Sequence, residues 1–353
     1  MNTKMKSIIG LMSGTSLDGL DIVYAQFDSS NYSTFNILYS ETISYSDTWK
    51  EKLQNAITFS KNALSDLDIE YGKYLGKEVA SFIFKNQIDT VDFIASHGHT
   101  ILHEPDKGIT LQIGNGQVIS DETSCKVICD FRTQDVQFGG QGAPLVPIGD
   151  ELLFSEYDSC LNLGGFANVS FKKDNIRVAY DICPVNIVLN YYVNKLGFEF
   201  DDKGKMASEG SINVALLSAL NSLDYYGKTP PKSLGFEWVI QHIFPLIDEN
   251  ETNISTILRT FIEHVSIQIG NNLSLQKNVL ITGGGVFNEF LIERIKSKTT
   301  SEICIPNSQI INYKEALIFA FLGLLRADNQ VNCLKSVTGA NKNHSSGKIF
   351  TPK

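Results

Sequence analysis

Apolar residues recur at helical spacing in six segments of the chain, and short apolar runs lie between them. The helical segments span residues 66–87, 184–196, 211–223, 251–273, 287–298 and 313–328. The short runs at residues 91–95, 126–129, 278–282 and 302–305 have the length of buried strands flanked by helices. This alternation of helices and buried strands predicts an α/β fold.

A strand, a glycine-containing turn and a second strand occur near the start of the chain and again near its middle. The first copy covers residues 7–25 and the second covers residues 160–171. Duplicated hairpins favour two related α/β lobes with a cleft between them, although two unrelated hairpins would give the same pattern. No linker separates the halves, so we place the boundary near Asp150, with lobes at residues 1–150 and 151–353. The C-terminal helix can belong to either lobe.

The composition of the chain indicates which class of partner it binds and in which cellular compartment it is expected. With 42% hydrophobic and 20% charged residues, the 353-residue chain can bury a substantial core. Its net charge of −9 lacks the basic surface that nucleic-acid or anionic-membrane binding needs, so we expect a small-molecule partner. The six cysteines form no C-x-x-C pair and are expected to be reduced thiols. The longest apolar run, residues 316–325, is about half a membrane span, and the N-terminus has no signal h-region, so we expect a cytoplasmic protein.

The turn of the first hairpin combines glycines, hydroxyls and carboxylates. Gly14 and Gly19 allow close approach to the backbone, and Asp18 and Asp21 offer carboxylates. Backbone N–H groups of such a turn can surround a phosphate, and a carboxylate can reach Mg²⁺ directly or through water. A polar hairpin whose side chains bond only to their own backbone has the same residue types. Both interpretations stay open on residue types alone.

A second glycine-rich turn follows the expected strand 278–282. Neither a P-loop nor a complete G-x-G-x-x-G occurs in the chain, so the two standard nucleotide fingerprints are absent. Gly283, Gly284 and Gly285 nevertheless lie between a strand and the expected helix 287–298. Such a turn suits a nucleotide lying against it, and it equally suits close packing of strand on helix.

Histidine and arginine side chains mark a candidate substrate region. His97, His99 and His103 lie within seven residues, which allows a metal site, but a polar loop with His97 as a substrate contact is the preferred interpretation. Arg132 opens a polar, glycine-rich stretch that runs to residue 147, and its planar fork suits a carboxylate or hydroxyl-rich ligand. An ion pair of Arg132 with a neighbouring aspartate explains that residue equally well.

Two carboxylates complete the set of candidates. Asp181 closes the expected strand 176–180, three residues before Pro184, which suits the first turn of the next helix. A carboxylate there can act as a general base or can cap that helix. Glu315 opens the helix 313–328 and is either a substrate contact or an acid favoured by the helix dipole.

The ordered set of motifs resembles the anhydro-N-acetylmuramic acid kinase family, which belongs to the acetate kinase, sugar kinase, Hsp70 and actin superfamily. The similarity runs over almost the whole chain. The motifs are Met12-Ser13-Gly14-Thr15-Ser16-Leu17-Asp18-Gly19, Ser96-His97-Gly98, Leu111-Gln112-Ile113-Gly114, Asp130-Phe131-Arg132 through Pro147, Asn162-Leu163-Gly164-Gly165-Phe166-Ala167-Asn168, Pro230-Pro231-Lys232-Ser233, Gly283-Gly284-Gly285 with Asn288, Glu315-Ala316 and Val337-Thr338-Gly339-Ala340.

The resemblance implies two duplicated RNase H-like, actin-like ATPase lobes with ATP and Mg²⁺ in an interlobe active-site cleft. It implies that ATP phosphorylates O6 of 1,6-anhydro-N-acetylmuramic acid while water opens the anhydro ring at C1, as a step of cell-wall recycling. Asp181 aligns with the base for that water, Glu315 aligns with a glutamate at the sugar site, and His97 and Arg132 fall on the substrate side. Members of the family often pair as dimers, so the resemblance allows a homodimer. The implied nucleotide-binding residues are Gly14, Thr15, Ser16, Leu17, Asp18, Gly19, Leu20, Asp21, Gly164, Gly165, Gly283, Gly284, Gly285 and Asn288, with Asp18 as a Mg²⁺ contact through ATP.

The chain departs from the family pattern beside the implied base. The family usually has Asp-Thr-Gly-Pro-Gly-Asn, where this chain has Asp181-Ile182-Cys183-Pro184-Val185-Asn186, and His99 replaces the usual glutamine after His-Gly. Another sugar or anhydrosugar is therefore the alternative substrate. A silent nucleotide or sugar sensor is a further alternative, against which the retained carboxylates argue. A glycosidase using Asp181 and Glu315 would leave both glycine-rich turns unexplained.

Overall fold

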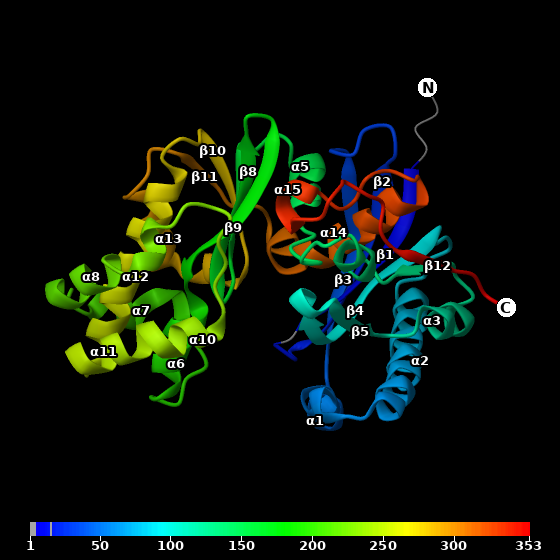
Figure 1. The fold of residues 1–353 in the computed structure, drawn as a ribbon, viewed down its shortest axis with the longest axis horizontal. Coiled ribbons are helices and arrows are strands. Elements are labelled where there is room, and N and C mark those ends of the chain that lie inside the picture. The colour runs from blue at the N-terminus through cyan, green and yellow to red at the C-terminus, as the bar shows by residue number, and fades with distance from the viewer. Residues whose placement is uncertain (1–4, 15) are drawn as a thin grey trace. The chain divides into compact units, whose positions relative to one another are not determined.

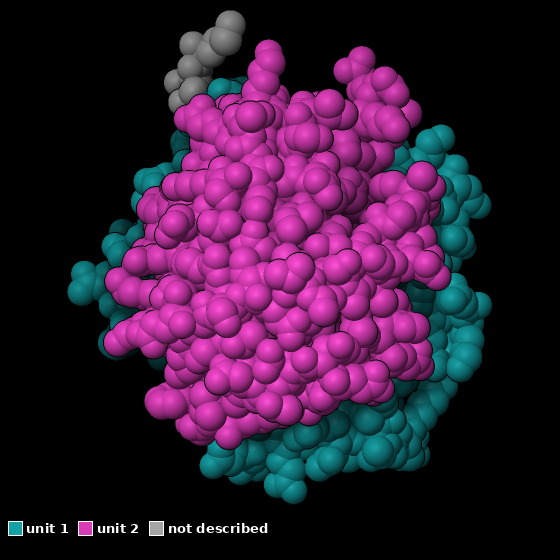
Figure 2. Space-filling view, turned by 90° about the vertical axis from the view of Figure 1, so that its left-hand side faces the viewer, with its two compact units in different colours: residues 1–155, 313–353 teal, residues 156–312 magenta. Residues whose placement is uncertain are grey.

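A computed structural model of the chain describes residues 5–14 and 16–353. The chain forms two compact units, residues 1–155 with 313–353 (unit 1) and residues 156–312 (unit 2), which Figure 2 distinguishes by colour. The expected first lobe ended at residue 150. Residues 313–353, which that division left with the second half while allowing the C-terminal helix to join the first, cluster with unit 1.

Unit 1 is built on a seven-stranded mixed sheet (Figure 1). Its main strand order is β12-β6-β4-β1-β2-β3, and β5 pairs with β4 beside this path. The helices and strands of unit 1 are β1 Met5–Ser13, β2 Gly19–Asp28, β3 Phe35–Ser44, α1 Asp47–Asn55, η1 Ala56–Thr58, α2 Lys61–Lys85, β4 Phe93–Glu104, η2 Pro105–Lys107, β5 Ile109–Ile113, α3 Gly116–Thr123, β6 Val127–Cys129, α4 Thr133–Gln137, α5 Pro147–Leu153, α15 Lys335–Thr338 and β12 Lys348–Phe350.

Unit 2 contains a five-stranded sheet in the order β11-β10-β7-β8-β9. Its elements are β7 Ser159–Leu163, β8 Phe166–Lys173, β9 Ile176–Pro184, α6 Asn186–Asn194, η3 Asp202–Gly204, α7 Lys205–Glu209, α8 Val214–Asn221, α9 Asp224–Gly227, α10 Phe236–Trp238, η4 Val239–Ile243, α11 Phe244–Asn250, α12 Ile254–Leu273, β10 Asn278–Thr282, η5 Gly284–Phe287, α13 Glu289–Lys296 and β11 Glu302–Cys304. Helix α14, Ser308–Ala327, starts in unit 2 and continues into unit 1.

The two sheets repeat one pattern of strand pairing. In unit 1, β1 pairs antiparallel with β2 and β2 with β3, whereas β1 with β4 and β4 with β6 are parallel. In unit 2, β7 pairs antiparallel with β8 and β8 with β9, whereas β7 with β10 and β10 with β11 are parallel. Each sheet therefore has the order 3-2-1-4-5 with the same directions, which is the RNase H-like arrangement. The internal repeat in the sequence reflects a structural duplication.

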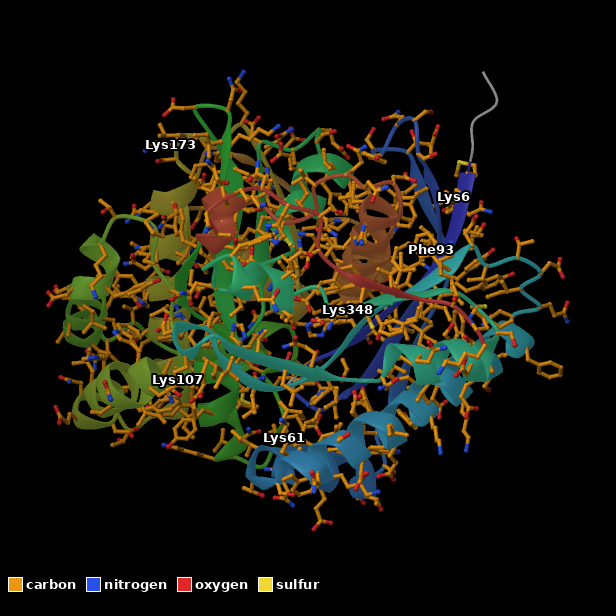
Figure 3. All side chains as sticks on the ribbon, turned by 45° about the vertical axis from the view of Figure 1, so that its right-hand side comes forward. Lys6, Lys61, Phe93, Lys107, Lys173 and Lys348 are labelled. Atoms are coloured by element: carbon orange, nitrogen blue, oxygen red, sulfur yellow. The ribbon has the colours of Figure 1, made fainter. Side chains whose placement is uncertain are left out.

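Helices cover both faces of the unit 1 sheet. Ile9 and Leu11 of β1 lie in one buried cluster with Tyr71 and Leu75 of α2. Gly10, between them, faces α14, where a Cβ would lie 2.1 Å from the Ala316 carbonyl oxygen. Alternate residues of a strand point to opposite faces, so Gly10 lies on the face opposite Ile9 and Leu11, where the lack of a side chain lets α14 approach closely. Phe93, labelled in Figure 3 at the start of β4, is also buried.

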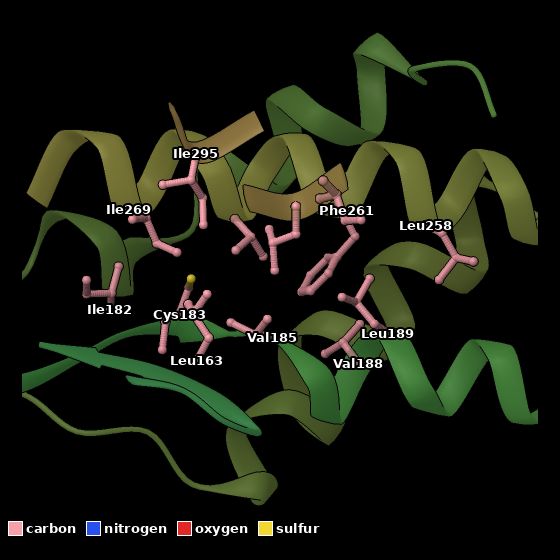
Figure 4. Packing of buried hydrophobic residues seen from close by; sticks show 14 of the residues in the cluster. Leu163, Ile182, Cys183, Val185, Val188, Leu189, Leu258, Phe261, Ile269 and Ile295 are labelled. Carbon is pink, nitrogen blue, oxygen red and sulfur yellow. The ribbon is translucent and has the colours of Figure 1, made fainter. Parts of the chain in front are cut away.

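The core of unit 2 lies between its sheet and helices α6, α8, α12 and α13. Figure 4 shows part of it, where Leu163 and Cys183 face Phe261 and Ile269 of α12. Helix α12 begins at Ile254 because the Asn253 side chain accepts a hydrogen bond from the Thr256 backbone N–H. This packing fixes the ends of β7, β9 and β10, which carry the candidate residues of the unit.

Candidate functional site

His97, Arg132 and Glu315 come together in unit 1 from three separate segments. His97 lies in β4, Arg132 follows the end of β6, and Glu315 is in the part of α14 that belongs to unit 1. The Nε and Nη2 atoms of Arg132 lie 3.1 and 2.9 Å from the Nε2 atom of His97. Its Nη1 donates to the Gly142 carbonyl at 2.7 Å. The guanidinium therefore bonds to His97 and the following loop, and among the described residues it forms neither of the ion pairs with Asp130 or Asp135 that the sequence allowed.

The protonation of His97 is set by these partners. Its Nδ1 lies 2.9 Å from the Gly98 carbonyl oxygen, so Nδ1 carries the proton and Nε2 accepts from Arg132. Burial, and then the positive charge of Arg132, hold the pKa of His97 well below its usual range. His97 is therefore a neutral hydrogen-bond acceptor that orients the guanidinium.

Glu315 presents an exposed carboxylate close to this pair. Desolvation of the carboxyl by the surrounding protein raises the pKa of Glu315. The positive charges of Arg132 and then Lys314 lower this pKa, and the negative charge of Asp21 raises it. Lys314 itself pairs with Asp150 at 2.6 Å. The arrangement combines a cationic fork and an acidic acceptor within one unit, which suits a ligand with hydroxyls and a carboxylate.

The first hairpin turn places its acidic residues at the surface. Asp18 is exposed, and Asp21 is partly exposed with its Oδ1 accepting a hydrogen bond from the Thr42 hydroxyl at 2.6 Å. Burial raises the pKa of Asp21, the Thr42 bond lowers it, and the charge of Asp18 raises it. Among the described residues, a Cβ added to Gly14 would meet only the Ser16 side chain, at 3.5 Å. The geometry leaves room for an anion or a hydrated cation beside the turn.

The other implied nucleotide residues of this hairpin differ in exposure. Ser16 is exposed, whereas Gly19 and Leu20 are buried at the start of β2. Leu17 has φ of 61°, a left-handed conformation that is uncommon for a leucine and that concentrates at functional turns. Thr15 lies outside the described residues.

The three clustered histidines belong to a strand and not to the expected polar loop. β4 continues to Glu104 because it pairs with β5, so His97, His99 and His103 are strand residues. His99 Nδ1 bonds to the Ser13 hydroxyl at 2.8 Å and His103 Nδ1 lies 3.1 Å from the Thr110 hydroxyl. Burial lowers the pKa of His99 to about 4. Each imidazole has its own partner, and these contacts explain the motif without a shared metal ion.

Asp181 lies inside β9, because the strand continues four residues beyond its predicted end at residue 180. The strand continues to Pro184 and α6 starts at Asn186, so the expected position of Pro184 in the helix was wrong. Asp181 does not cap α6, because its Oδ2 accepts the Leu234 backbone N–H at 2.9 Å and Val185 is the N-cap residue. Its Oδ1 has no hydrogen-bond donor among the described residues.

A loop around Lys232 determines the environment of Asp181. The Tyr225 hydroxyl donates to the Asp181 carbonyl at 2.7 Å, and the Lys232 ammonium lies 4.7 Å from the Tyr225 ring centre. Burial raises the pKa of Asp181 and the Leu234 bond lowers it. Sequence reasoning gave no role to Tyr225 or Leu234, and only the Pro230–Ser233 motif signalled this loop. The result is a carboxylate with one fixed oxygen and one oxygen available to a ligand or water.

The glycine-rich turns of unit 2 meet at one edge of its sheet. β7 and β10 are parallel neighbours, so the turns that follow them lie side by side. A Cβ on Gly283 would lie 2.6 Å from Asn162 Oδ1, and one on Gly285 would lie 2.8 Å from the Leu163 Cβ. These two glycines are therefore required for packing.

Gly284 and the turn after β7, which contains Gly164 and Gly165, leave backbone accessible at the same edge of the unit 2 sheet. Gly284 is exposed, and within the part of the chain that the structure describes, a Cβ there would approach only the Asn186 amide, at 4.0 Å. Val185 N–H donates to Gly165 O at 2.8 Å and Asn186 N–H donates to Gly164 O at 3.3 Å, which holds the start of α6 against the turn. The edge thus has the open backbone that a phosphate-bearing ligand needs.

Asn288 and the residues that replace the family pattern after Asp181 have structural roles in unit 2. The Asn288 side chain caps α13 by accepting the Leu291 N–H at 2.9 Å. Ile182, Cys183 and Val185 are 1%, 0% and 0% exposed and point into the core (Figure 4). The residues that replace the usual family pattern are therefore core side chains.

The comparisons with known proteins agree with the motifs. A family model described as anhydro-N-acetylmuramic acid kinase matches residues 6–352. The chain belongs to this family. It is accordingly an enzyme of the sugar kinase class.

Several relatives span the whole chain. Proteins named anhydro-N-acetylmuramic acid kinase from Aliivibrio fischeri and Haemophilus influenzae are each 32% identical to it, covering 98% and 99% of this chain and 99% of each relative. One from Sulfurimonas denitrificans is 30% identical, covering 97% of this chain and 98% of its own length. Solved structures align less closely, and a ROK family glucokinase from Streptomyces griseus has a TM-score of 0.42 at 11% identity, with 90% and 98% coverage.

No helix in the described part of the chain combines the length and apolar character that crossing a membrane requires.

Proposed function

We propose that this kinase uses ATP and Mg²⁺ to phosphorylate 1,6-anhydro-N-acetylmuramic acid and that water opens the anhydro ring in the same reaction. The products are N-acetylmuramic acid 6-phosphate and ADP, which links the enzyme to recycling of the cell-wall amino sugar. Family membership over residues 6–352 supports the kinase reaction. The observation that carries the ring-opening step is the environment of Asp181, a partly buried carboxylate. Its Oδ2 accepts a hydrogen bond from the Leu234 N–H, and its Oδ1 receives none from the described residues.

In the proposed reaction Asp181 acts as general base. Its Oδ1 accepts a proton from water as the water oxygen bonds to C1, the C1–O6 bond breaks, and O6 takes the γ-phosphoryl group of ATP. One water, one ATP and one anhydrosugar give one sugar phosphate and one ADP, and the proton leaves Asp181 for solvent. The Leu234 N–H keeps the carboxylate oriented, which is the role of a fixed hydrogen bond to a catalytic base.

The residues of unit 1 are proposed to bind the sugar. The Arg132 fork, oriented by neutral His97, is suited to the lactyl carboxylate of a muramic acid, and Glu315 is suited to a sugar hydroxyl. An anhydro sugar without a carboxylate would leave the guanidinium without its anionic partner. This favours a muramic acid over the other anhydrosugars as the substrate.

The glycine-rich turns and the first hairpin are proposed to bind the nucleotide. The open backbone at Gly14, Gly164 and Gly284 can approach phosphate oxygens. Asp18 and Asp21 offer the hard oxygen ligands that Mg²⁺ prefers, directly or through water. When bound, Mg²⁺ neutralises charge on the phosphates during transfer. Asn288 acts through α13, which it caps.

Asp181→Asn tests the role of the base. The asparagine keeps an oxygen that can accept the Leu234 N–H but cannot take a proton, so we expect kcat to fall by about 10²- to 10⁴-fold while ATP affinity stays within about twofold. Asp224→Asn, an exposed residue of the same unit, is the matched control and should keep normal turnover. Turnover of Asp181→Asn near that of the unmodified enzyme would remove Asp181 from this role.

Because protein burial raises the pKa of Asp181, protonation should inactivate the base at a higher pH than for an ordinary aspartate. The acid limb of the kcat/KM profile is therefore expected at a pH above about 3.9, the pKa of an ordinary aspartate.

A kinase of another sugar, the second candidate, would show ADP release with a different member of a sugar panel. That outcome would retain the kinase and replace its substrate.

A further inference from the structure

Asp135, Cys333 and His344 form a buried cluster of ligand-type side chains in unit 1. One carboxylate oxygen, the thiol sulfur and one imidazole nitrogen all lie within 4.8 Å of one another. Asp135, Cys333 and His344 are 0%, 2% and 6% exposed, respectively. None of them belongs to the residues proposed above for sugar or nucleotide.

The Nε2 atom of the His344 imidazole faces this cluster and has no hydrogen-bond partner among the described residues. Its Nδ1 lies 3.1 Å from the Lys342 carbonyl oxygen, so Nδ1 carries the proton and Nε2 presents a lone pair. Nε2 is buried, and no described residue forms a hydrogen bond with it, although Asp135 Oδ1 is 3.5 Å away. In the neutral imidazole this lone pair faces a carboxylate oxygen, an unfavourable contact that a bound metal ion or a proton between the two atoms would relieve.

The distances and the ligand types fit one class of cation. Tetrahedral Zn²⁺, with bonds of about 2.0–2.2 Å to nitrogen and oxygen and about 2.3 Å to sulfur, separates its ligand atoms by about 3.3–3.6 Å. The 3.5 Å between His344 Nε2 and Asp135 Oδ1 matches this separation. Thiolate and imidazole together select zinc and similar borderline metals over Mg²⁺ or Ca²⁺.

The surroundings of the cluster resemble the outer shell of a metal site. A ligating histidine usually donates its other N–H to a carbonyl, as His344 does to Lys342. The ligating carboxylate is itself usually hydrogen-bonded, and Asp135 accepts from the Thr338 hydroxyl and the Gly142 N–H, both at 2.8 Å.

We propose that Asp135, Cys333 and His344 bind one Zn²⁺-class ion, with a fourth position for water. The ion joins the C-terminal segment of unit 1 to Asp135 of helix α4. The same Asp135 carboxylate accepts the Gly142 N–H, and the Gly142 carbonyl accepts from Arg132, so the ion stabilises the loop that orients the guanidinium. Its role is structural support of that loop, and the site itself is separate from the transferred phosphoryl group.

Cobalt titration of the full-length protein tests the site. After chelator treatment under reducing conditions, Co²⁺ should bind one equivalent and give a thiolate-to-cobalt charge-transfer band with the intense visible bands of four-coordination. Cys333→Ala should abolish the charge-transfer band, and His344→Gln should weaken affinity by tenfold or more. Cys304→Ala, a thiol of unit 2 outside the cluster, is the matched control and should leave the spectrum unchanged.

A second readout protects the test against misfolding of a variant. Zn²⁺ should raise the thermal midpoint of the unmodified protein and of Cys304→Ala, but not that of Cys333→Ala or His344→Gln, measured against each protein without metal. A charge-transfer band that persists in Cys333→Ala, or an unmodified protein that binds no Co²⁺ and gains no stability from Zn²⁺, would overturn the proposal. The latter result would mean that His344, Asp135 and Cys333 pack together without a metal ion.

Discussion

The guanidinium of Arg132 depends on a neutral imidazole. Because His97 accepts from two of its nitrogens and the Gly142 carbonyl accepts from a third, three directions of the fork are fixed. Protonated His97 would face Arg132 with a second positive charge, which burial and Arg132 itself oppose. His97 therefore positions the Arg132 guanidinium, and the buried hydrogen bonds around the two side chains offset the free-energy cost of removing them from water.

Arg132→Lys should raise KM for the sugar about tenfold or more, because an ammonium keeps the charge but cannot make the same set of bonds. Steady-state kinetics with the sugar varied at saturating ATP measure the change. Arg294→Lys in unit 2, where the arginine pairs with Glu263, is the control and should leave this KM unchanged. An unchanged KM in Arg132→Lys would separate the guanidinium from substrate binding.

Buried neutral histidines make stability depend on pH. Burial lowers the pKa of His99 to about 4 and that of His264 to about 3. Both lie below the value of about 6.5 for an unfolded histidine, so the unfolded chain takes up protons first as the pH falls. The free energy of unfolding is therefore complete above about pH 6.5 and decreases from there toward pH 4.

His99→Gln should flatten this pH dependence. Urea unfolding at pH 7 and pH 5 should show a loss smaller by on the order of 1 kcal/mol in the variant than in the unmodified protein, since one proton-linked group has been removed. The same slope in both proteins would mean that His99 is not kept neutral by the fold.

At the scale of elements, hydrophobic periodicity predicted six helices, which correspond to α2, α6, α8, α12, α13 and α14, but it missed others such as α1 and α3 and did not place every end. Strand β10, Asn278–Thr282, coincides with its predicted range. Helix α2 begins at Lys61, five residues before its predicted start, because the Ser60 side chain caps it. A capping side chain acts locally and is visible in the sequence once the helix is known, so these boundaries were recoverable.

Tertiary pairing decided the elements that the sequence missed. The extension of β4 through its histidines depends on β5, which pairs with it. Asp181 lies within β9 because that strand pairs with β8 as far as Pro184. The candidate residues themselves were identified from residue types and from the family motifs, whereas the His97–Arg132 contact and the Leu234 bond needed the fold.

The glycine turn after β10 separates packing from ligand access. Gly285→Ala should reduce the free energy of unfolding by about 1–3 kcal/mol, because its Cβ would overlap Leu163. Gly284→Ala meets open space and should fold normally while raising KM for ATP several-fold. Urea unfolding and ATP kinetics on both variants measure the two effects, and an ATP KM unchanged by Gly284→Ala would contradict the proposed phosphate contact.

At the scale of the whole molecule, one sheet pattern is used twice and supplemented differently. Unit 1 adds β5 and β12 to the shared order, and β12 pairs with β6 so that the end of the chain returns to the unit that contains its start. Lys348 of β12, labelled in Figure 3, pairs with Asp130 at 2.8 Å, immediately before the segment that carries Arg132. The C-terminal segment is thus part of the framework of the sugar-side residues.

The most direct test of the proposed reaction is to incubate the purified protein with ATP, Mg²⁺ and 1,6-anhydro-N-acetylmuramic acid and to follow ADP and the sugar product together by mass spectrometry. We predict N-acetylmuramic acid 6-phosphate in equal amount to ADP. A phosphorylated sugar lighter by one water, with the anhydro ring intact, would contradict the role of Asp181, and the absence of any sugar phosphate would contradict the substrate assignment.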